Sequence, residues 1–180
     1  MRNAVQNALN ASKVEVVPPA TKTNPTIPAS TPLFTSNNAD IDLDGVDAPD
    51  KWPNQRMTSF NYADGTSLSA YKNPYIVVPG SSEFTKYVGC VALVWDSSSS
   101  QGFYAVVGDV RPSSKMGEVS IYLAQQFKPG DPFVNSKGVE YALTGSFTYY
   151  IIPGSDIRGT ATPQTINGMI NSKGREYFGY

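Results

Sequence analysis

The sequence contains no histidine, a single cysteine and no long apolar run. Without histidine, catalysis by Ser-His-Asp or Cys-His groups, the usual histidine zinc sites and histidine proton transfer are all excluded. The lone cysteine, Cys90, cannot form an intrachain disulfide, and its apolar neighbours predict a buried, unreactive thiol. Any catalysis must therefore rely on carboxylates.

Basic residues are too few and too scattered for a nucleic-acid surface. The chain has 14 Lys and Arg against 15 Asp and Glu, a net charge of -1, whereas nucleic-acid binding requires clustered cations. No segment approaches the ~20 apolar residues that cross a bilayer, and residues 1–13 hold no apolar core of signal-peptide length. We expect no nucleic-acid or membrane partner, no cofactor, and a monomer that is secreted or otherwise extracytoplasmic.

The composition is that of a β-rich protein, with 11 Tyr, 8 Phe, 15 Gly and 14 Pro. Many short apolar runs separated by turn residues indicate an all-β fold with one or two short helices. We expect a compact six- to eight-stranded barrel with a lateral substrate cleft, and a double-psi-like barrel is the topology that we favour. The Pro- and Thr-rich residues 1–32 are predicted to be a tail or linker, and residues 33–180 the folded domain.

Apolar runs that end at turn residues predict the main strands at 75–78, 88–95 and 102–108. Residues 139–143 and 147–153 are expected to form a hairpin, turned at 144–146. A short helix is expected at 164–170.

Two carboxylates, Asp109 and Glu118, lie nine positions apart and flank a small polar loop. Gly108 is predicted to end the preceding strand, which places Asp109 at a strand tip. After Glu118, apolar residues recur with helical spacing, so Glu118 is predicted to begin a helix. Hydrolysis of a glycosidic bond needs one protonated and one ionised carboxyl group on opposite sides of the linkage. The simpler alternative is that Asp109 pairs with Arg111 or Lys115, while Glu118 only complements a helix dipole.

A second acidic segment contains Asp40, Asp42 and Asp44. It matches the first half of an EF-hand calcium loop, but Lys51 stands where the bidentate Glu is required, so an EF-hand is not expected. If the segment is a strand, its alternating apolar residues face the core and the three aspartates share the opposite face. A metal ion, a neighbouring Lys or Arg, or an amine-bearing substrate are the candidates that would neutralise them, and a solvated acidic turn is the fourth alternative.

Two tyrosines are candidate sugar contacts, because flat amphipathic rings stack on pyranose faces. These are Tyr71 and Tyr75, which lie just before and at the start of the first predicted strand. Packing in the core is the alternative use of both rings.

Five segments, in this order along the chain, resemble glycoside hydrolase family 75, the fungal-type chitosanases. They are ADIDLDGVD, TSFNYADGTSLSAYKNPYIVVPG, GFYAVVGD, GEVSIYLA and YIIPGSD. The resemblance covers roughly residues 33 to 155. It implies endo-hydrolysis of β-1,4-linked glucosamine polymers with inversion at the anomeric carbon. The implied partner is a polysaccharide, chitosan or a related aminosugar polymer.

The same resemblance makes Asp109 and Glu118 the catalytic pair. Glu118 would protonate the leaving oxygen and Asp109 would activate a water, and an exchange of these roles stays open. Inversion requires the two carboxyl groups to stand about 6.5–9.5 Å apart. A helix N-terminus lowers the pKa of an acid, so burial or a nearby negative charge must keep Glu118 protonated. Asp40, Asp42 and Asp44 then become candidates for binding substrate ammonium groups, and no metal is assigned to the site.

The chain also departs from the family pattern. Leu43 stands where a cysteine is common, and the loop RPSSKM lacks the acidic residues often found between the two catalytic segments. The cations of this loop, Arg111 and Lys115, would repel a cationic polymer. Two alternatives therefore remain: a peptidoglycan glycan-strand hydrolase of bacterial or phage-delivered type, and a non-catalytic carbohydrate-binding module.

Overall fold

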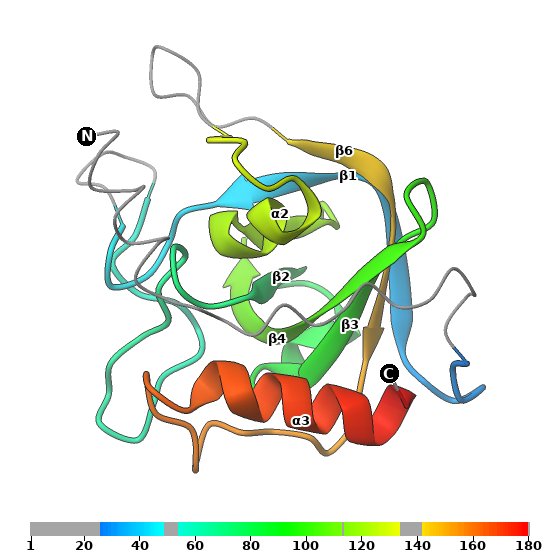
Figure 1. The fold of residues 1–180 in the computed structure, drawn as a ribbon. Helices are drawn as coiled ribbons and strands as arrows, with labels where there is room; N and C mark the ends of the chain where they lie inside the picture. Colours follow the sequence, from blue (N-terminus) through cyan, green and yellow to red (C-terminus); the bar gives the residue numbers. More distant parts are fainter. Residues whose placement is uncertain (1–25, 49–53, 113, 134–141, 180) are drawn as a thin grey trace.

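Six strands form a closed barrel with the order β1-β5-β2-β4-β3-β6 (Figure 1). The computed structural model describes residues 26–48, 54–112, 114–133 and 142–179. The strands are β1 (Leu33–Asp42), β2 (Tyr75–Pro79), β3 (Val91–Asp96), β4 (Gln101–Arg111), β5 (Glu118–Ser120) and β6 (Leu143–Ile151). Two α-helices, α2 (Ile121–Phe127) and α3 (Ile166–Phe178), and the 3-10 helix η1 (Glu83–Tyr87) complete the described part. The predicted all-β barrel with short helices is thus confirmed.

The barrel combines antiparallel and parallel neighbours. β3 lies antiparallel between β4 and β6, and β6 continues antiparallel to β1. The other half contains two parallel pairs, β1 with β5 and β2 with β4, and β2 runs antiparallel to β5. The acidic residues of interest all lie in or beside this mixed half. The double-psi-like topology and the lateral cleft stay predictions.

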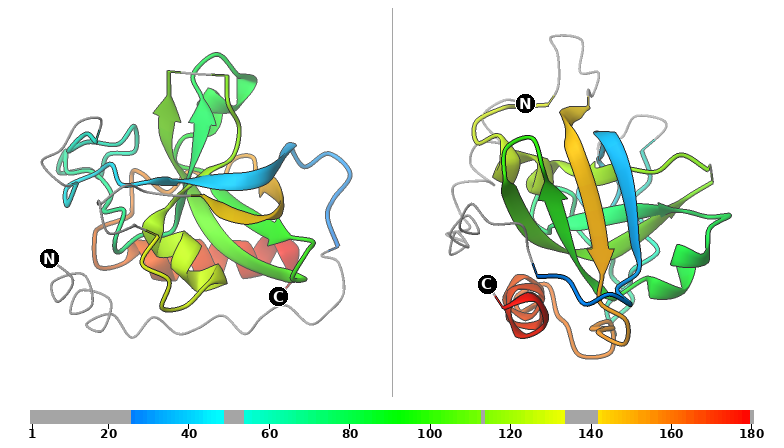
Figure 2. Two further views of the ribbon diagram at one scale, coloured as in Figure 1. Left: turned by 90° about the horizontal axis from the view of Figure 1, so that it is seen from above. Right: turned by 90° about the vertical axis from the view of Figure 1, so that its right-hand side faces the viewer.

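The core explains why the strand sequences read as continuous apolar runs. Every residue of β2 and β3 is buried, because these strands are covered on both faces. Helix α3 covers one side of the barrel, where it packs against β3 and β4 (Figures 1 and 2). A Cβ atom at Gly174 would lie 2.4 Å from the Tyr104 ring, so α3 approaches β4 as closely as only glycine permits.

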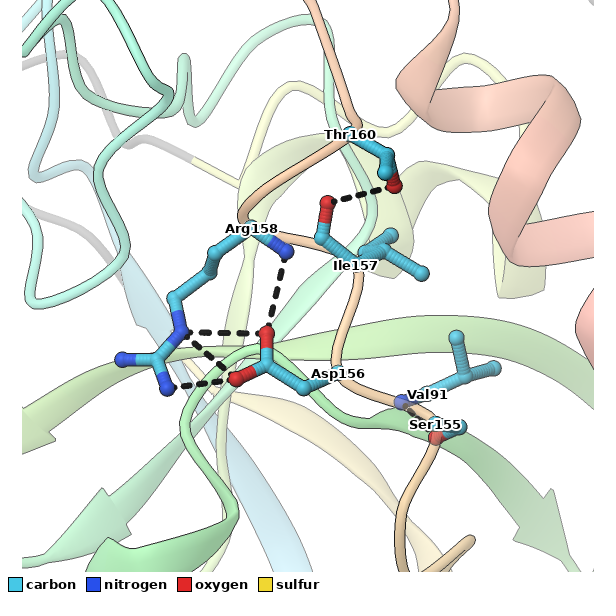
Figure 3. A network of polar contacts seen from close by, with 6 residues as sticks. All are labelled: Val91, Ser155, Asp156, Ile157, Arg158 and Thr160. Atoms are coloured by element: carbon cyan, nitrogen blue, oxygen red, sulfur yellow. Dashed lines mark hydrogen bonds and ion pairs between the residues drawn. The ribbon is translucent and has the colours of Figure 1, made fainter.

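The segment between β6 and α3 is fixed against the start of β3 (Figure 3). The Ser155 hydroxyl oxygen accepts a hydrogen bond from the Val91 N–H at 2.7 Å. One residue further on, the Asp156 carboxylate pairs with the guanidinium of Arg158, and Arg158 Nε lies 3.0 Å from each carboxylate oxygen. These contacts fix the approach of the chain to α3.

The folded domain begins before the predicted start at residue 33. The Ile27 side chain packs against the core. Thr31 is buried, and its hydroxyl lies 3.1 Å from the Tyr177 hydroxyl of α3. The Pro32 carbonyl accepts a hydrogen bond from the Ile151 N–H at 2.9 Å. Residues 1–25 of the predicted tail lie outside the described residues.

Other predicted elements differ in their bounds. The hairpin turn expected at 144–146 lies inside the continuous strand β6, and residues 139–141 of its first arm lie outside the described part. The C-terminal helix begins two residues later than predicted and extends to Phe178. In the part of the chain that the structure describes, neither helix has the length and apolar character of a membrane span.

Candidate active site

Asp109 and Glu118 flank one residue of the sheet. Val77 of β2 is the register partner of Glu118 on β5 and of Asp109 on β4. Side chains of register partners point to the same face of a sheet. Neighbouring strands lie about 4.8 Å apart, so the backbones of Asp109 and Glu118 are separated by roughly 9.5 Å. The structure thus brings the predicted pair together on one face.

An irregularity in β4 turns Asp109 toward Glu118. Ile76 pairs with Val107 but Val77 pairs with Asp109, so Gly108 is an extra residue in β4. Without this bulge the alternation of side chains would turn Asp109 to the opposite face. A Cβ atom at position 108 would lie 2.6 Å from Tyr75 Cβ, which explains why glycine occupies it. The prediction that Gly108 ends the strand is therefore wrong, because β4 continues through Asp109 to Arg111.

Asp109 is 8% exposed and firmly oriented. Its Oδ1 atom accepts hydrogen bonds from the Ser59 N–H at 2.9 Å, the Ser59 hydroxyl at 2.7 Å and the Val110 N–H at 2.7 Å. Burial raises the pKa of Asp109 above its ordinary value, and these hydrogen bonds oppose the increase. The carboxylate is thus held in one orientation. Nothing in the sequence around Ser59 predicts this contact, which depends on a segment fifty positions away.

Glu118 begins strand β5, not a helix. Helix α2 starts three residues later at Ile121, and Ser120 is its N-cap, where the hydroxyl accepts a hydrogen bond from the Leu123 N–H at 3.2 Å. The helical spacing after Glu118 does correspond to a helix, but that helix begins at Ile121 and not at Glu118. The predicted effect of a helix N-terminus on the pKa of Glu118 therefore does not apply.

Burial dominates the environment of Glu118, whose side chain is 15% exposed. Burial raises its pKa to about 7, and the guanidinium of Arg111 opposes this increase. The negative charges of Asp40, Asp44 and Asp109 add to the increase. The required environment for a protonated acid is thus present, and its main cause is desolvation.

Asp40 is neutralised by two cations. Arg111 Nη1 lies 3.5 Å from Asp40 Oδ2 and 3.1 Å from Glu118 Oε2. The ammonium group of Lys115 also contacts Asp40 Oδ2. The alternative that Arg111 or Lys115 pairs with Asp109 is therefore wrong. Arg111 pairs with Asp40 and Glu118, and Lys115 pairs with Asp40.

Asp42 and Asp44 form a different group, together with Asp109. One carboxylate oxygen of each of the three residues lies within 4.8 Å of the other two. Asp42 is only 7% exposed, and burial, followed by the negative charges of Glu118 and Asp44, raises its pKa well above the ordinary value. Asp42 is therefore too deeply buried for the predicted direct contact with a polymer. Asp40 and Asp44 remain partly exposed.

The tyrosine predictions change. Tyr75 is 0% exposed, so its ring cannot stack on a sugar. Its hydroxyl instead donates to the Asp44 carbonyl at 2.9 Å, at the edge of the acidic group. Tyr71 is partly buried and packs against the core. Tyr149, which no sequence pattern indicates, is buried with its hydroxyl 3.3 Å from Ser36 Oγ. Burial raises the pKa of Tyr149, and the negative charges of Asp40 and Glu118 add to the increase.

This arrangement offers a buried acid whose pKa lies near neutrality and a firmly oriented second carboxylate on the same face. Such a pair can donate one proton and accept another across a bound substrate. In comparisons with known proteins, no family model matches this chain and no curated protein matches it.

Proposed function

We propose that this protein is an endo-acting glycoside hydrolase that cleaves β-1,4 bonds of chitosan by inversion. The observation that carries the proposal is the position of Val77 between Glu118 and Asp109. The backbones of the two residues stand roughly 9.5 Å apart and both side chains leave the same face, so the separation of about 6.5–9.5 Å that inversion requires between the carboxyl groups is within their reach.

In the proposed reaction Glu118 is the general acid. Its pKa of about 7 means that a large fraction is protonated at neutral pH. Glu118 gives this proton to the glycosidic oxygen as the bond from that oxygen to the anomeric carbon breaks. The leaving sugar thus departs as a neutral alcohol.

Asp109 is the general base. It accepts a proton from a water that attacks the anomeric carbon from the opposite side, which inverts the configuration. A base of this kind must contact only one water, so a small exposed area is sufficient. Ser59 contributes by holding the Asp109 carboxylate in place with two hydrogen bonds. The proton then passes to solvent, and Glu118 regains one.

The charges around the pair bear on the substrate. The partly exposed carboxylate of Asp44 favours a polymer with ammonium groups, as in chitosan, whereas Asp40 is already paired with Arg111 and Lys115. The cations Arg111 and Lys115 lie beside Glu118 and Asp40 and favour a polymer that also carries carboxylates. Peptidoglycan glycan strands are therefore the second candidate.

The test is incubation of the purified protein with chitosan and with cell-wall sacculi, followed by sizing of the products. NMR of the first product formed from chitosan should show the α-anomer, as inversion requires. Glu118→Gln and Asp109→Asn should each lower turnover by about 10²–10⁴, whereas Glu83→Gln, at an exposed position of η1, should not. Release from neither polymer would contradict the proposal, and release from sacculi alone would favour the second candidate.

A further inference from the structure

We propose that Asp42, Asp44 and Asp109 bind a divalent, oxygen-preferring cation, represented by Ca²⁺, when no substrate is present. This site goes beyond the hydrolysis proposed above. The three carboxylates offer oxygens that all lie within 4.8 Å of one another. Ca²⁺ binds oxygen at about 2.3–2.6 Å, so two oxygens on opposite sides of the ion stand ~4.6–5.2 Å apart. The three oxygens are therefore close enough to share one Ca²⁺ after at most a few tenths of an ångström of movement, and the larger, more flexible coordination of Ca²⁺ tolerates this better than the near-ideal octahedron of Mg²⁺.

An independent observation points to a missing ligand. Asp42 Oδ2 is buried and has no hydrogen-bond partner among the residues that the structure describes. The Tyr75 hydroxyl lies close enough to the Asp42 carboxylate for the two to interact, but it has a single proton and donates it to the Asp44 carbonyl at 2.9 Å. Buried carboxylate oxygens without a donor are rare and costly, so a cation or a proton must satisfy this atom.

The three carboxylates are already oriented for such an ion. Asp42 Oδ1 accepts the Asp44 N–H at 2.9 Å, and Asp44 Oδ1 accepts the Gln55 N–H at 2.6 Å. Asp109 Oδ1 accepts both donors of Ser59. Hydrogen bonds of this kind fix ligand oxygens before the ion arrives, as outer contacts do in metal sites. Carboxylate oxygens alone select hard cations over softer ones.

The burial of Asp42 favours a small ion over a substrate amine. At 7% exposure the Asp42 carboxylate cannot be reached by a pyranose ring. The side-chain cations of the neighbouring loop, Arg111 and Lys115, are bound by Asp40 and Glu118. The proposed site differs from an EF-hand, because its third ligand, Asp109, comes from β4 and because Asp40 pairs with Arg111 and Lys115 instead of joining the site.

The ion would compete with the proposed reaction. While Asp109 coordinates a cation, it cannot accept the proton of the attacking water, so added Ca²⁺ should inhibit hydrolysis. The binding measurement below requires no hydrolysis. Its failure would leave the proposed function intact, and absence of hydrolysis would leave the cation site intact.

Terbium(III), a luminescent substitute for Ca²⁺, provides the measurement on the full chain. Tyrosine excitation should sensitise terbium emission, because Tyr75 adjoins the site, and CaCl₂ should displace the signal. Asp42→Asn should weaken both ions by more than about tenfold, the scale of outer-contact losses. The matched control Glu83→Gln removes one exposed carboxylate of η1 and should bind like the wild type.

Melting temperatures give a second readout. Ca²⁺ should raise the Tm of the wild type and of Glu83→Gln, but not that of Asp42→Asn. Should Asp42→Asn fail to fold by circular dichroism, Asp44→Asn at the partly exposed ligand replaces it. The proposal is overturned if the wild type gives no Ca²⁺-displaceable emission, or if the folded Asn variants keep wild-type affinity. A proton on Asp42 would then satisfy the buried oxygen.

Discussion

The guanidinium of Arg111 lies 3.1 Å from the carboxylate of Glu118, the residue that must hold a proton in the proposed reaction. A cation at this distance favours the charged carboxylate, yet burial outweighs it and leaves the pKa of Glu118 near 7. The acid is therefore poised between two opposing influences, and either can be changed by substitution.

Replacing Arg111 with methionine should raise the pKa of Glu118 above 7, because the cation that opposes protonation is removed. The alkaline limb of the pH profile of kcat should shift to higher pH. Lys115→Met is the matched control, since the Lys115 ammonium contacts Asp40 and not Glu118. An alkaline limb that stays fixed in Arg111→Met would show that Glu118 is not the acid.

The wild-type profile of kcat/KM should be bell-shaped. Activity should decline as pH rises through about 7, where Glu118 loses its proton. As pH falls, activity should decline when Asp109 becomes protonated. Because burial raises the pKa of Asp109, this decline should begin at a higher pH than for an ordinary carboxylate. A profile that is flat through neutral pH would contradict the assignment of Glu118.

Glu118 should also make folding pH-dependent. A carboxyl group whose pKa is raised on folding binds its proton more tightly in the folded state, so stability falls as pH rises from about 4.5 to about 7. In Glu118→Gln, the decrease in the free energy of unfolding between these pH values should be smaller by roughly 1–3 kcal/mol. The substitution also removes the ion pair with Arg111, which partly offsets this gain. Urea unfolding at about pH 4.5 and at about pH 7 measures the difference. Equal slopes in the two proteins would contradict the burial effect.

Gly108→Ala should destabilise the barrel, because the new Cβ would lie 2.6 Å from both Leu68 Cδ1 and Tyr75 Cβ. Overpacking of this kind costs about 1–3 kcal/mol. Gly159→Ala is the control, since nothing lies within 4 Å of a Cβ there. Comparable Tm values for the two variants would argue against the tight packing at the bulge.

Ser59→Ala removes the hydroxyl that donates to Asp109 at 2.7 Å. The pKa of Asp109 should rise further, since this hydrogen bond opposes the effect of burial. The acid limb should move up, and kcat should fall by about tenfold, the scale of one lost hydrogen bond to a charged group. Ser97→Ala, at an exposed turn, is the control. If the acid limb of the pH profile is unchanged in Ser59→Ala, then the Ser59 hydroxyl does not influence the general base.

The barrel could be predicted because its short apolar runs are buried along their whole length and bounded by turn residues. The run at 75–78, for instance, differs from β2 only by Pro79. Local patterns failed where a distant contact decides the outcome. Thr144 to Ser146 look like a turn, yet they lie inside β6, where Thr144 pairs with Asn38 of β1 and a local irregularity precedes the next pair, Ser36 with Phe147. Glu118 has helical spacing after it, but β1 and β2 on either side hold it as strand.

The candidate site was predictable only in its residue types. That Asp109 and Glu118 approach each other follows from their shared partner Val77, which no local pattern reveals. The sequence also does not indicate that the three aspartates belong to two separate groups. Asp40 and Asp42 alternate along one strand, yet the first meets two cations while the second is buried with Asp44 and Asp109. The register and curvature of β1 place Asp40 and Asp42 in these different surroundings.

The extra residue at Gly108 is needed for the candidate site but not for the apolar core of the barrel. Deletion of that one glycine would turn the Asp109 side chain to the opposite face of the sheet. A descendant of that kind would keep its apolar interior and lose the partner of Glu118. Sequences that share the apolar segments but lack the extra residue before the aspartate should therefore be inert barrels.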